Sequence, residues 1–183
     1  MSSWFRANPE AGAPAYAPDA PAWPLVALAL AVALLVQSTL EPLFPIRGAT
    51  ISWVLLLVLW YAIRTGTGGG FVLGLIAGAC EDALAGNTGA AWTFSTALVG
   101  AAAGRLARTW LADTKLALLP GVVLATLLRY ALFSAILAAE GRMLPLALAH
   151  FHAAAWQALL DGLVALALLA LFPQLGRYGA PRR

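Results

Sequence analysis

Four charged residues lie inside apolar stretches of the chain, where an ionised side chain needs a partner or a function. Glu81 and Asp82 are adjacent near the end of one stretch, and Arg129 and Asp161 are near the middle of two later ones. A lone charge at the centre of a bilayer costs at least about 2.5 to 3.5 kcal/mol on insertion scales, and pairing removes much of this cost. We predict that Arg129 and Asp161, on consecutive antiparallel helices, form an intramembrane charge pair. A polar gate or a substrate site is the alternative.

The two adjacent carboxylates precede the turn Gly86–Gly89 by about one helical turn. One interpretation is that they are hydrated or cap this turn. The other is that Asp82 accepts hydrogen bonds from the following helix, where Thr93 and Thr96 are candidate partners. Acid–base catalysis by the pair ranks below both, because adjacent residues point to different faces of a helix.

Other chemistry-bearing residue types form no recognisable site. His150 and His152 are two positions apart, whereas metal ligands on a helix need steps of three or four. Neither the nucleophile motif G-x-S-x-G nor the phosphate loop G-x-x-x-x-G-K-[ST] occurs in the sequence. The chain has one cysteine, Cys80, so it has no intrachain disulfide. We predict a protein that is not an enzyme and that has no catalytic residues, no metal and no cofactor.

Glycine recurs at four-residue steps in the third apolar stretch. A step of four is just over one helical turn, so such positions stack along one slowly drifting face. The series comprises Gly66, Gly70, Gly74, Gly78, Asp82 and Gly86, with Gly89 in the turn that follows. The next stretch carries Gly100 and Gly104 at the same step. Missing side chains let helix backbones approach closely in lipid, so we predict that these residues are structural and pack the two helices as a tight hairpin.

The composition is that of a membrane protein. Of the 183 residues, 62% are hydrophobic and 10% are charged, with a mean hydropathy of +0.83, whereas soluble domains are about 25% charged. The net charge of +3 comes without a basic cluster interleaved with aromatic residues, so we predict no nucleic-acid partner.

Six apolar stretches predict six transmembrane helices with short loops, an all-α polytopic fold. They lie at about Trp23–Leu40, Ala49–Ile63, Thr67–Ala85, Ala90–Leu111, Leu116–Ala139 and Leu146–Phe172. The predicted domains are a flexible N-terminal tail at 1–22, a six-helix transmembrane domain at 23–175 and a basic C-terminal tail at 176–183.

The basic residues predict the orientation. With six spans, one side of the membrane holds eight of them and the other holds two, Arg47 and Arg142. The eight are Arg6, Arg64, Arg105, Arg108, Lys115, Arg177, Arg182 and Arg183. Lysine and arginine concentrate on the cytoplasmic side, so we predict that both termini, and with them both tails, are cytoplasmic.

The glycine region resembles the central segment of the rod shape-determining protein MreD family. That family has a G-x-x-x-G-x-x-x-D-x-x-x-G-x-x-G pattern, matched here by Gly74, Gly78, Asp82, Gly86 and Gly89. The downstream glycine and arginine of the family are matched by Gly100, Gly104 and Arg105. The chain departs from the family where the second helix opens with Thr50-Ile51-Ser52 rather than Pro-Asp, and where Asp161 stands in place of an amide.

The resemblance implies a function without chemistry of its own. MreD-like proteins are subunits of the bacterial cell-elongation machinery in the inner membrane. They bind the bitopic protein MreC and, through it, act with MreB filaments and peptidoglycan synthases. The alternative is a small-molecule-binding subunit similar to the S-components of energy-coupling-factor transporters, which also have six helices and whose fold the family resembles. Such a subunit needs a polar, aromatic pocket toward the outer face, and the short, weakly polar outer loops disfavour it.

Overall fold

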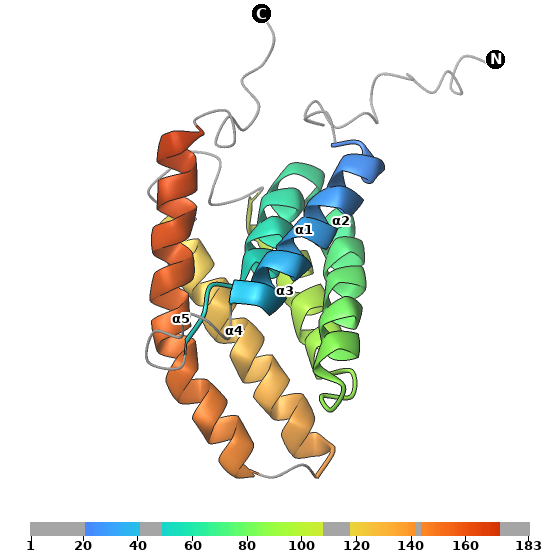
Figure 1. Cartoon of the computed structure of the whole chain (residues 1–183), viewed down its shortest axis with the longest axis vertical. Helices are drawn as coiled ribbons and strands as arrows, with labels where there is room; N and C mark the ends of the chain where they lie inside the picture. The colour runs from blue at the N-terminus through green and yellow to red at the C-terminus, as the bar shows by residue number, and fades with distance from the viewer. Residues whose placement is uncertain (1–20, 41–48, 108–117, 142–143, 173–183) are drawn as a thin grey trace, which may run out of the picture.

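A computed structural model of the chain describes residues 21–40, 49–107, 118–141 and 144–172, although not the side chains of residues 40 and 144–152. This part of the chain is all-helical. It contains five helices: α1 (Trp23–Leu40), α2 (Trp53–Ala85), α3 (Ala91–Ala107), α4 (Leu118–Ala139) and α5 (Leu144–Leu171) (Figure 1). The predicted all-α fold is therefore confirmed for the described residues.

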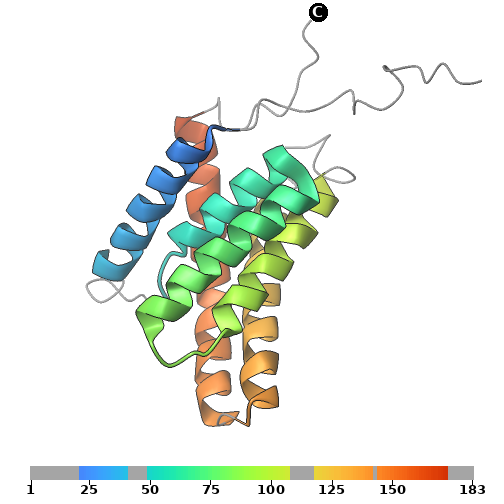
Figure 2. The same cartoon turned by 90° about the vertical axis from the view of Figure 1, so that its right-hand side faces the viewer.

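Helix α2 reverses its direction at Gly66. This residue has φ of 82° and ψ of −167°, values outside the helical region and in the range that glycine adopts without steric cost. Val54 shares one core cluster with Leu73 and Ala77, whereas a straight helix would separate Val54 from Ala77 by roughly 35 Å. The two halves of α2 therefore lie side by side and antiparallel, as the teal and green segments of Figure 2 show.

This reversal bears on the predicted count of six spans. The stretches predicted at Ala49–Ile63 and Thr67–Ala85 correspond to the two halves of α2, so the six predicted stretches fall on five helices of the described part of the chain. Within the described residues, three segments are by length and composition able to cross a membrane, namely α2, α4 and residues Ala153–Leu171 of α5. A shorter apolar helix lies at Trp23–Thr39.

The helices pack as two antiparallel pairs with α1 against one side. The second half of α2 packs along α3, α4 packs on α5 and also contacts α3, and α1 packs mainly on α2. One apolar core joins α1 to both halves of α2, through Val26, Leu30, Ala33, Val54, Val58, Tyr61, Leu73 and Ala77. A second joins α2, α3 and α4, through Leu55, Leu56, Leu59, Val99, Val122 and Ala125.

Large apolar side chains face outward on several helices. Leu25 and Leu35 of α1 are each 65% exposed, as is Leu84 of α2, and Leu171 of α5 is 73% exposed. Apolar surface of this extent marks contact with a membrane or with another protein. Together with the long apolar helices, it supports a membrane protein.

Two sets of predictions concern residues outside the described part of the chain. The predicted tails, apart from residues 21 and 22, lie outside the described residues. So do eight of the ten basic residues used for the orientation, namely Arg6, Arg47, Arg108, Lys115, Arg142, Arg177, Arg182 and Arg183. The first predicted helix has the bounds of α1, and the fourth ends four residues beyond Ala107, where the description of α3 stops.

Candidate functional site: a polar cavity around Arg129

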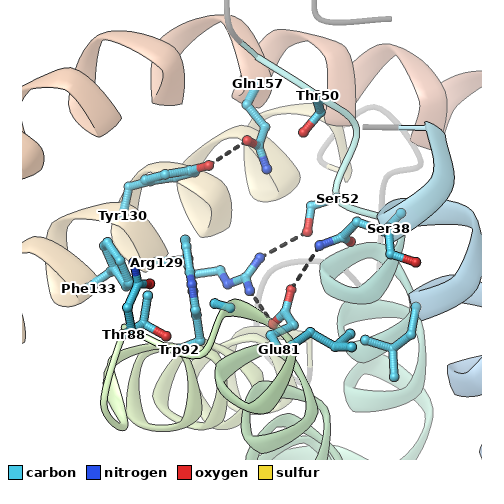
Figure 3. Close-up of a pocket in the computed structure, with 15 residues that line it drawn as sticks. Ser38, Thr50, Ser52, Glu81, Thr88, Trp92, Arg129, Tyr130, Phe133 and Gln157 are labelled. Atoms are coloured by element: carbon cyan, nitrogen blue, oxygen red, sulfur yellow. Dashed lines mark hydrogen bonds and ion pairs between the residues drawn. The ribbon is translucent and has the colours of Figure 1, made fainter. Parts of the chain in front are cut away.

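Arg129 is the centre of a buried polar cluster. Its side chain is 2% exposed and forms an ion pair with Glu81 of α2. Its Nε donates a hydrogen bond of 2.9 Å to Thr96 Oγ1 on α3. One terminal nitrogen donates a bond of 2.9 Å to Ser52 Oγ at the start of α2 (Figure 3). The fork of guanidinium donors thus connects α4 to α3 and to both ends of α2.

Glu81 extends the cluster to α1. Its other carboxylate oxygen accepts a hydrogen bond of 3.2 Å from Gln37 Nε2. The Gln37 oxygen in turn accepts a bond of 3.4 Å from the backbone N–H of Val54, in the first turn of α2. A glutamine near the end of α1 therefore caps one helix and holds the acid that pairs with Arg129.

Asp161 occupies the opposite side of the same cluster. It is fully buried on α5, accepts a hydrogen bond of 2.8 Å from the backbone N–H of Ser52 and another of 3.0 Å from Thr126 Oγ1. The Ser52 hydroxyl also caps α2 by accepting from the N–H of Leu55. A carboxylate is favourable at a helix N-terminus because the exposed N–H groups and the helix dipole attract negative charge.

The predicted direct pair of Arg129 with Asp161 is wrong. Arg129 pairs with Glu81, whereas Asp161 accepts hydrogen bonds from Ser52 and Thr126. Ser52 bridges the two charges, since its hydroxyl accepts from Arg129 and its N–H donates to Asp161. The prediction compared only the depths of Arg129 and Asp161, counted along their own helices. It therefore did not consider an acid on α2 as the partner of Arg129.

Aromatic rings close one side of the cluster. The Trp92 ring stacks on Phe133 with centroids 3.9 Å apart, and the Arg129 guanidinium carbon lies 4.4 Å from the Trp92 centroid. Arg129 and Phe133 are one turn apart on α4, so both contact Trp92. Beside them, Tyr130 donates a hydrogen bond of 2.5 Å to Gln157 Oε1 on α5.

These side chains line a cavity of about 410 Å³. Buried polar groups, among them Ser52, Arg129 and Gln157, form its floor. Exposed residues at the end of α1 and in the α2–α3 turn, including Ser38 and Asn87, form its rim. The cavity therefore opens at the end of the bundle opposite the reversal at Gly66.

Asp82, next to Glu81, serves a different contact. It accepts hydrogen bonds from Thr93 N at 2.8 Å, Thr93 Oγ1 at 2.6 Å, Trp92 N at 3.1 Å and Thr88 Oγ1 at 2.7 Å. One carboxylate thus satisfies two orphan N–H groups at the start of α3. Of the two threonines considered from the sequence, Thr93 makes this contact, whereas Thr96 accepts from Arg129.

The glycine faces of α2 and α3 bring the two backbones into contact. A Cβ atom on Gly74 would lie 2.5 Å from the carbonyl oxygen of Thr96, and one on Gly78 would lie 2.5 Å from that of Trp92. Gly70 and Gly100 oppose each other, and Gly104 lies against Gly66. Gly86 and Gly89 have another role, because both have positive φ and form the turn; the N–H of Gly86 bonds to the Asp82 carbonyl oxygen at 2.9 Å.

Sequence reasoning missed most of the cavity. Gln37, Ser52, Tyr130 and Gln157 were not singled out, and each is an ordinary polar residue in or beside an apolar stretch. The one feature they share in the sequence is a polar side chain in or beside an apolar stretch long enough to span a bilayer. Among the described residues, no group of three or more His, Cys, Asp or Glu side chains is placed to hold a metal. His150 and His152 lie outside the residues whose side chains are described.

Outward apolar helices around a buried, hydrogen-bonded charge cluster define the class, a helical membrane protein. The family model of rod shape-determining protein MreD matches residues 21–178, which is most of the chain. The chain therefore belongs to the MreD family, and the family predicted from the glycine region is confirmed. Comparisons with curated proteins and with solved structures gave no match. The family is a structural, shape-determining one, which supports a cell-shape role in the membrane.

Proposed function

We propose that this protein is a non-enzymatic subunit of the bacterial cell-elongation machinery that binds an MreC-like bitopic protein in the inner membrane. Through that partner it acts with MreB filaments and peptidoglycan synthases to organise wall synthesis. Membership of the MreD family supports the role. The observation that carries the binding proposal is the cavity around Arg129, because it offers a defined surface to another chain.

The cavity has the chemistry of a peptide-binding site. Its floor presents buried donors and acceptors, and its wall presents the rings of Trp92, Tyr130 and Phe133. Aromatic rings and arginine are enriched where one protein binds another. A single-span partner has a polar chain segment where it leaves the bilayer, and a cavity that opens at the end of the bundle is placed to receive such a segment.

A pair of rim variants tests this assignment. Ser38 and Thr39 are adjacent, exposed residues of α1, and of the two only Ser38 lines the cavity. Ser38→Trp should reduce co-purification of the MreC-like partner at least tenfold, whereas Thr39→Trp should leave it unchanged. Equal effects of the two variants, or no effect of either, would reject the cavity as the binding surface.

A small ligand is the second candidate occupant. Ligand sites measure about 300 to 1,000 Å³, and this polar, aromatic cavity falls in that range, which weakens the argument from short outer loops. A vitamin that raises the melting temperature of the purified protein, with the rise lost in Ser38→Trp and kept in Thr39→Trp, would favour an S-component-like function. A flat response across a vitamin panel would favour the partner.

We also propose six membrane crossings with both termini in the cytoplasm. The reversal at Gly66 supports this topology, because it makes two antiparallel halves of α2. Of the basic residues in the described part, Arg64 and Arg105 lie near this reversal. A cytoplasmic reporter fused after Arg183 should be active and one inserted within Gly86–Gly89 should be silent, with a periplasmic reporter giving the opposite pattern. The converse result at either site would refute the topology.

A further inference from the structure

A second cavity, remote from Arg129, lies on the lateral face of the bundle. It has a volume of about 540 Å³ and is lined almost wholly by apolar side chains of α1, the first half of α2, α4 and α5. The lining residues on α2 run from Trp53 to Ile63. Here we call this cavity the lateral groove. We propose that it binds one acyl chain of an anionic phospholipid, whose phosphate contacts Arg64.

The length of the lateral groove fits one leaflet of a bilayer. Ten residues of helix separate Trp53 from Ile63, which corresponds to roughly 15 Å. The hydrocarbon core of a bilayer is about 30 Å thick, so a single acyl chain covers about half of it. The groove is therefore the size of a one-leaflet site, and it extends from mid-bundle to the end where α2 reverses.

Polar groups follow the groove in the order of a phospholipid. Leu56, Trp60 and Arg64 are spaced at four-residue steps, so they share one face of α2. Leu56 and Trp60 line the groove, and the Arg64 guanidinium carbon lies 4.7 Å from the Trp60 ring centroid. The apolar wall of the groove, the Trp60 indole and the Arg64 guanidinium thus match, in this order, the acyl chain, the ester group and the phosphate of a phospholipid.

The Trp60 indole supplies an independent observation. Its Nε1 atom is buried, with no hydrogen-bond partner among the described residues. A buried donor without an acceptor is costly, and the indole N–H is a donor only. A lipid ester carbonyl about one helical turn below the phosphate provides the acceptor. An apolar transmembrane helix in the same groove does not offer this acceptor.

Native mass spectrometry of the full-length protein in detergent tests the proposal, with palmitoyl-oleoyl phosphatidylglycerol and the matching phosphatidylcholine as probes. We expect one phosphatidylglycerol to bind in preference to phosphatidylcholine. Arg64→Gln should weaken phosphatidylglycerol binding about fivefold, the factor for one basic residue at an anionic surface, with little change for phosphatidylcholine. The matched control is Arg105→Gln, which removes an exposed arginine of α3 outside the groove. Equal losses in the two variants would reject Arg64 as the phosphate contact.

A second pair of variants tests the groove itself. Ala29 and Ala31 are both exposed on α1, and Ala29 lines the groove whereas Ala31 does not. Ala29→Phe should weaken binding of both lipids, and Ala31→Phe should weaken neither. Trp60→Phe, which keeps a ring and removes the N–H, should weaken both by a smaller factor. If Ala29→Phe leaves lipid binding intact but abolishes co-purification of a membrane protein, the groove holds a transmembrane helix and the proposal fails.

Discussion

Two contacts of this bundle hold helices together by opposite means. Between α3 and the second half of α2, side chains are absent and the backbones meet at Gly70, Gly74 and Gly78. Around Arg129, long polar side chains reach from one helix to the next and join them by hydrogen bonds and an ion pair. The first contact depends on shape alone, whereas the second depends on every donor having an acceptor.

The difference predicts how each contact responds to change. Lipid is as apolar as a leucine side chain, so a glycine face gains its stability from close van der Waals packing. Any added side chain destroys that packing, whatever its polarity. In the Arg129 cluster, by contrast, the loss of one partner leaves another buried charge without its counter-ion. Removing both partners of a pair should therefore be less harmful than removing one.

The largest effect should come from Arg129→Ala. This change leaves Glu81 buried without its counter-ion, and breaking a buried pair typically costs about 3 to 5 kcal/mol. Glu81→Ala should cost a similar amount, and the double variant should recover part of the loss. Thermal unfolding of all four proteins in detergent gives the coupling energy of the pair.

A parallel cycle of Arg129→Ala with Asp161→Ala provides the control. Because Ser52 separates these two charges, their coupling should be weaker than that of Arg129 with Glu81. The opposite order would show that the direct pair predicted from the sequence is the energetically dominant one. If the stability losses of the single variants simply add in both double variants, Arg129 stabilises the bundle through its neutral partners, Ser52 and Thr96.

The next largest effect should come from the glycine face. Gly74→Leu and Gly78→Leu insert side chains against the backbone of α3, and overpacking of this kind costs about 1 to 3 kcal/mol. Ala79→Leu and Ala83→Leu are matched controls on the same helix, because both residues are exposed. The yield of folded protein in detergent measures the effect. Equal losses at all four positions would refute a specific role for the stripe.

The same contrast explains what the sequence could predict. The glycine contact and the helix positions are local features, because a four-residue period or an apolar run lies within one stretch of chain. The ends of α1 and the break at Gly66 follow from such signals. The antiparallel packing of α2 on α3 follows too, since a short turn joins two small-residue faces.

The Arg129 cluster is not local, and its composition was mostly missed. Glu81 and Arg129 are 48 positions apart, Gln37 comes from α1, and Ser52 lies at the opposite end of α2 from Glu81. Counting depth along α4 and α5 brings Arg129 level with Asp161, but the lateral placement of α2 decides the partner. A backbone N–H also has no sequence signal, so the bond from Ser52 N to Asp161 could not be anticipated.

A smaller effect is expected at Asp82, where the two kinds of contact meet. It lies on the glycine face of α2 and caps the first N–H groups of α3. Asp82→Ala should cost about 1 to 2 kcal/mol, the upper range for the loss of a helix cap. Asp82→Asn keeps one acceptor oxygen and should recover about half. Thermal unfolding checks both variants, and an unchanged melting temperature for Asp82→Ala would show that water replaces the cap.

The smallest effect should come from Tyr130→Phe, which removes the hydroxyl bonded to Gln157. A net hydrogen bond is worth about 0.5 to 1.5 kcal/mol, and a buried acceptor left without a donor costs more. Both residues line the cavity, however, and a polar cavity of about 410 Å³ has room for water to replace the lost donor. We therefore expect a loss of less than about 1 kcal/mol in thermal unfolding, and a similarly small loss in Gln157→Leu. Strong coupling between the two changes in the double variant would show that the cavity excludes water. The Arg129 side of the bundle would then be as intolerant of small changes as the glycine face, and the comparison between the two contacts would fail.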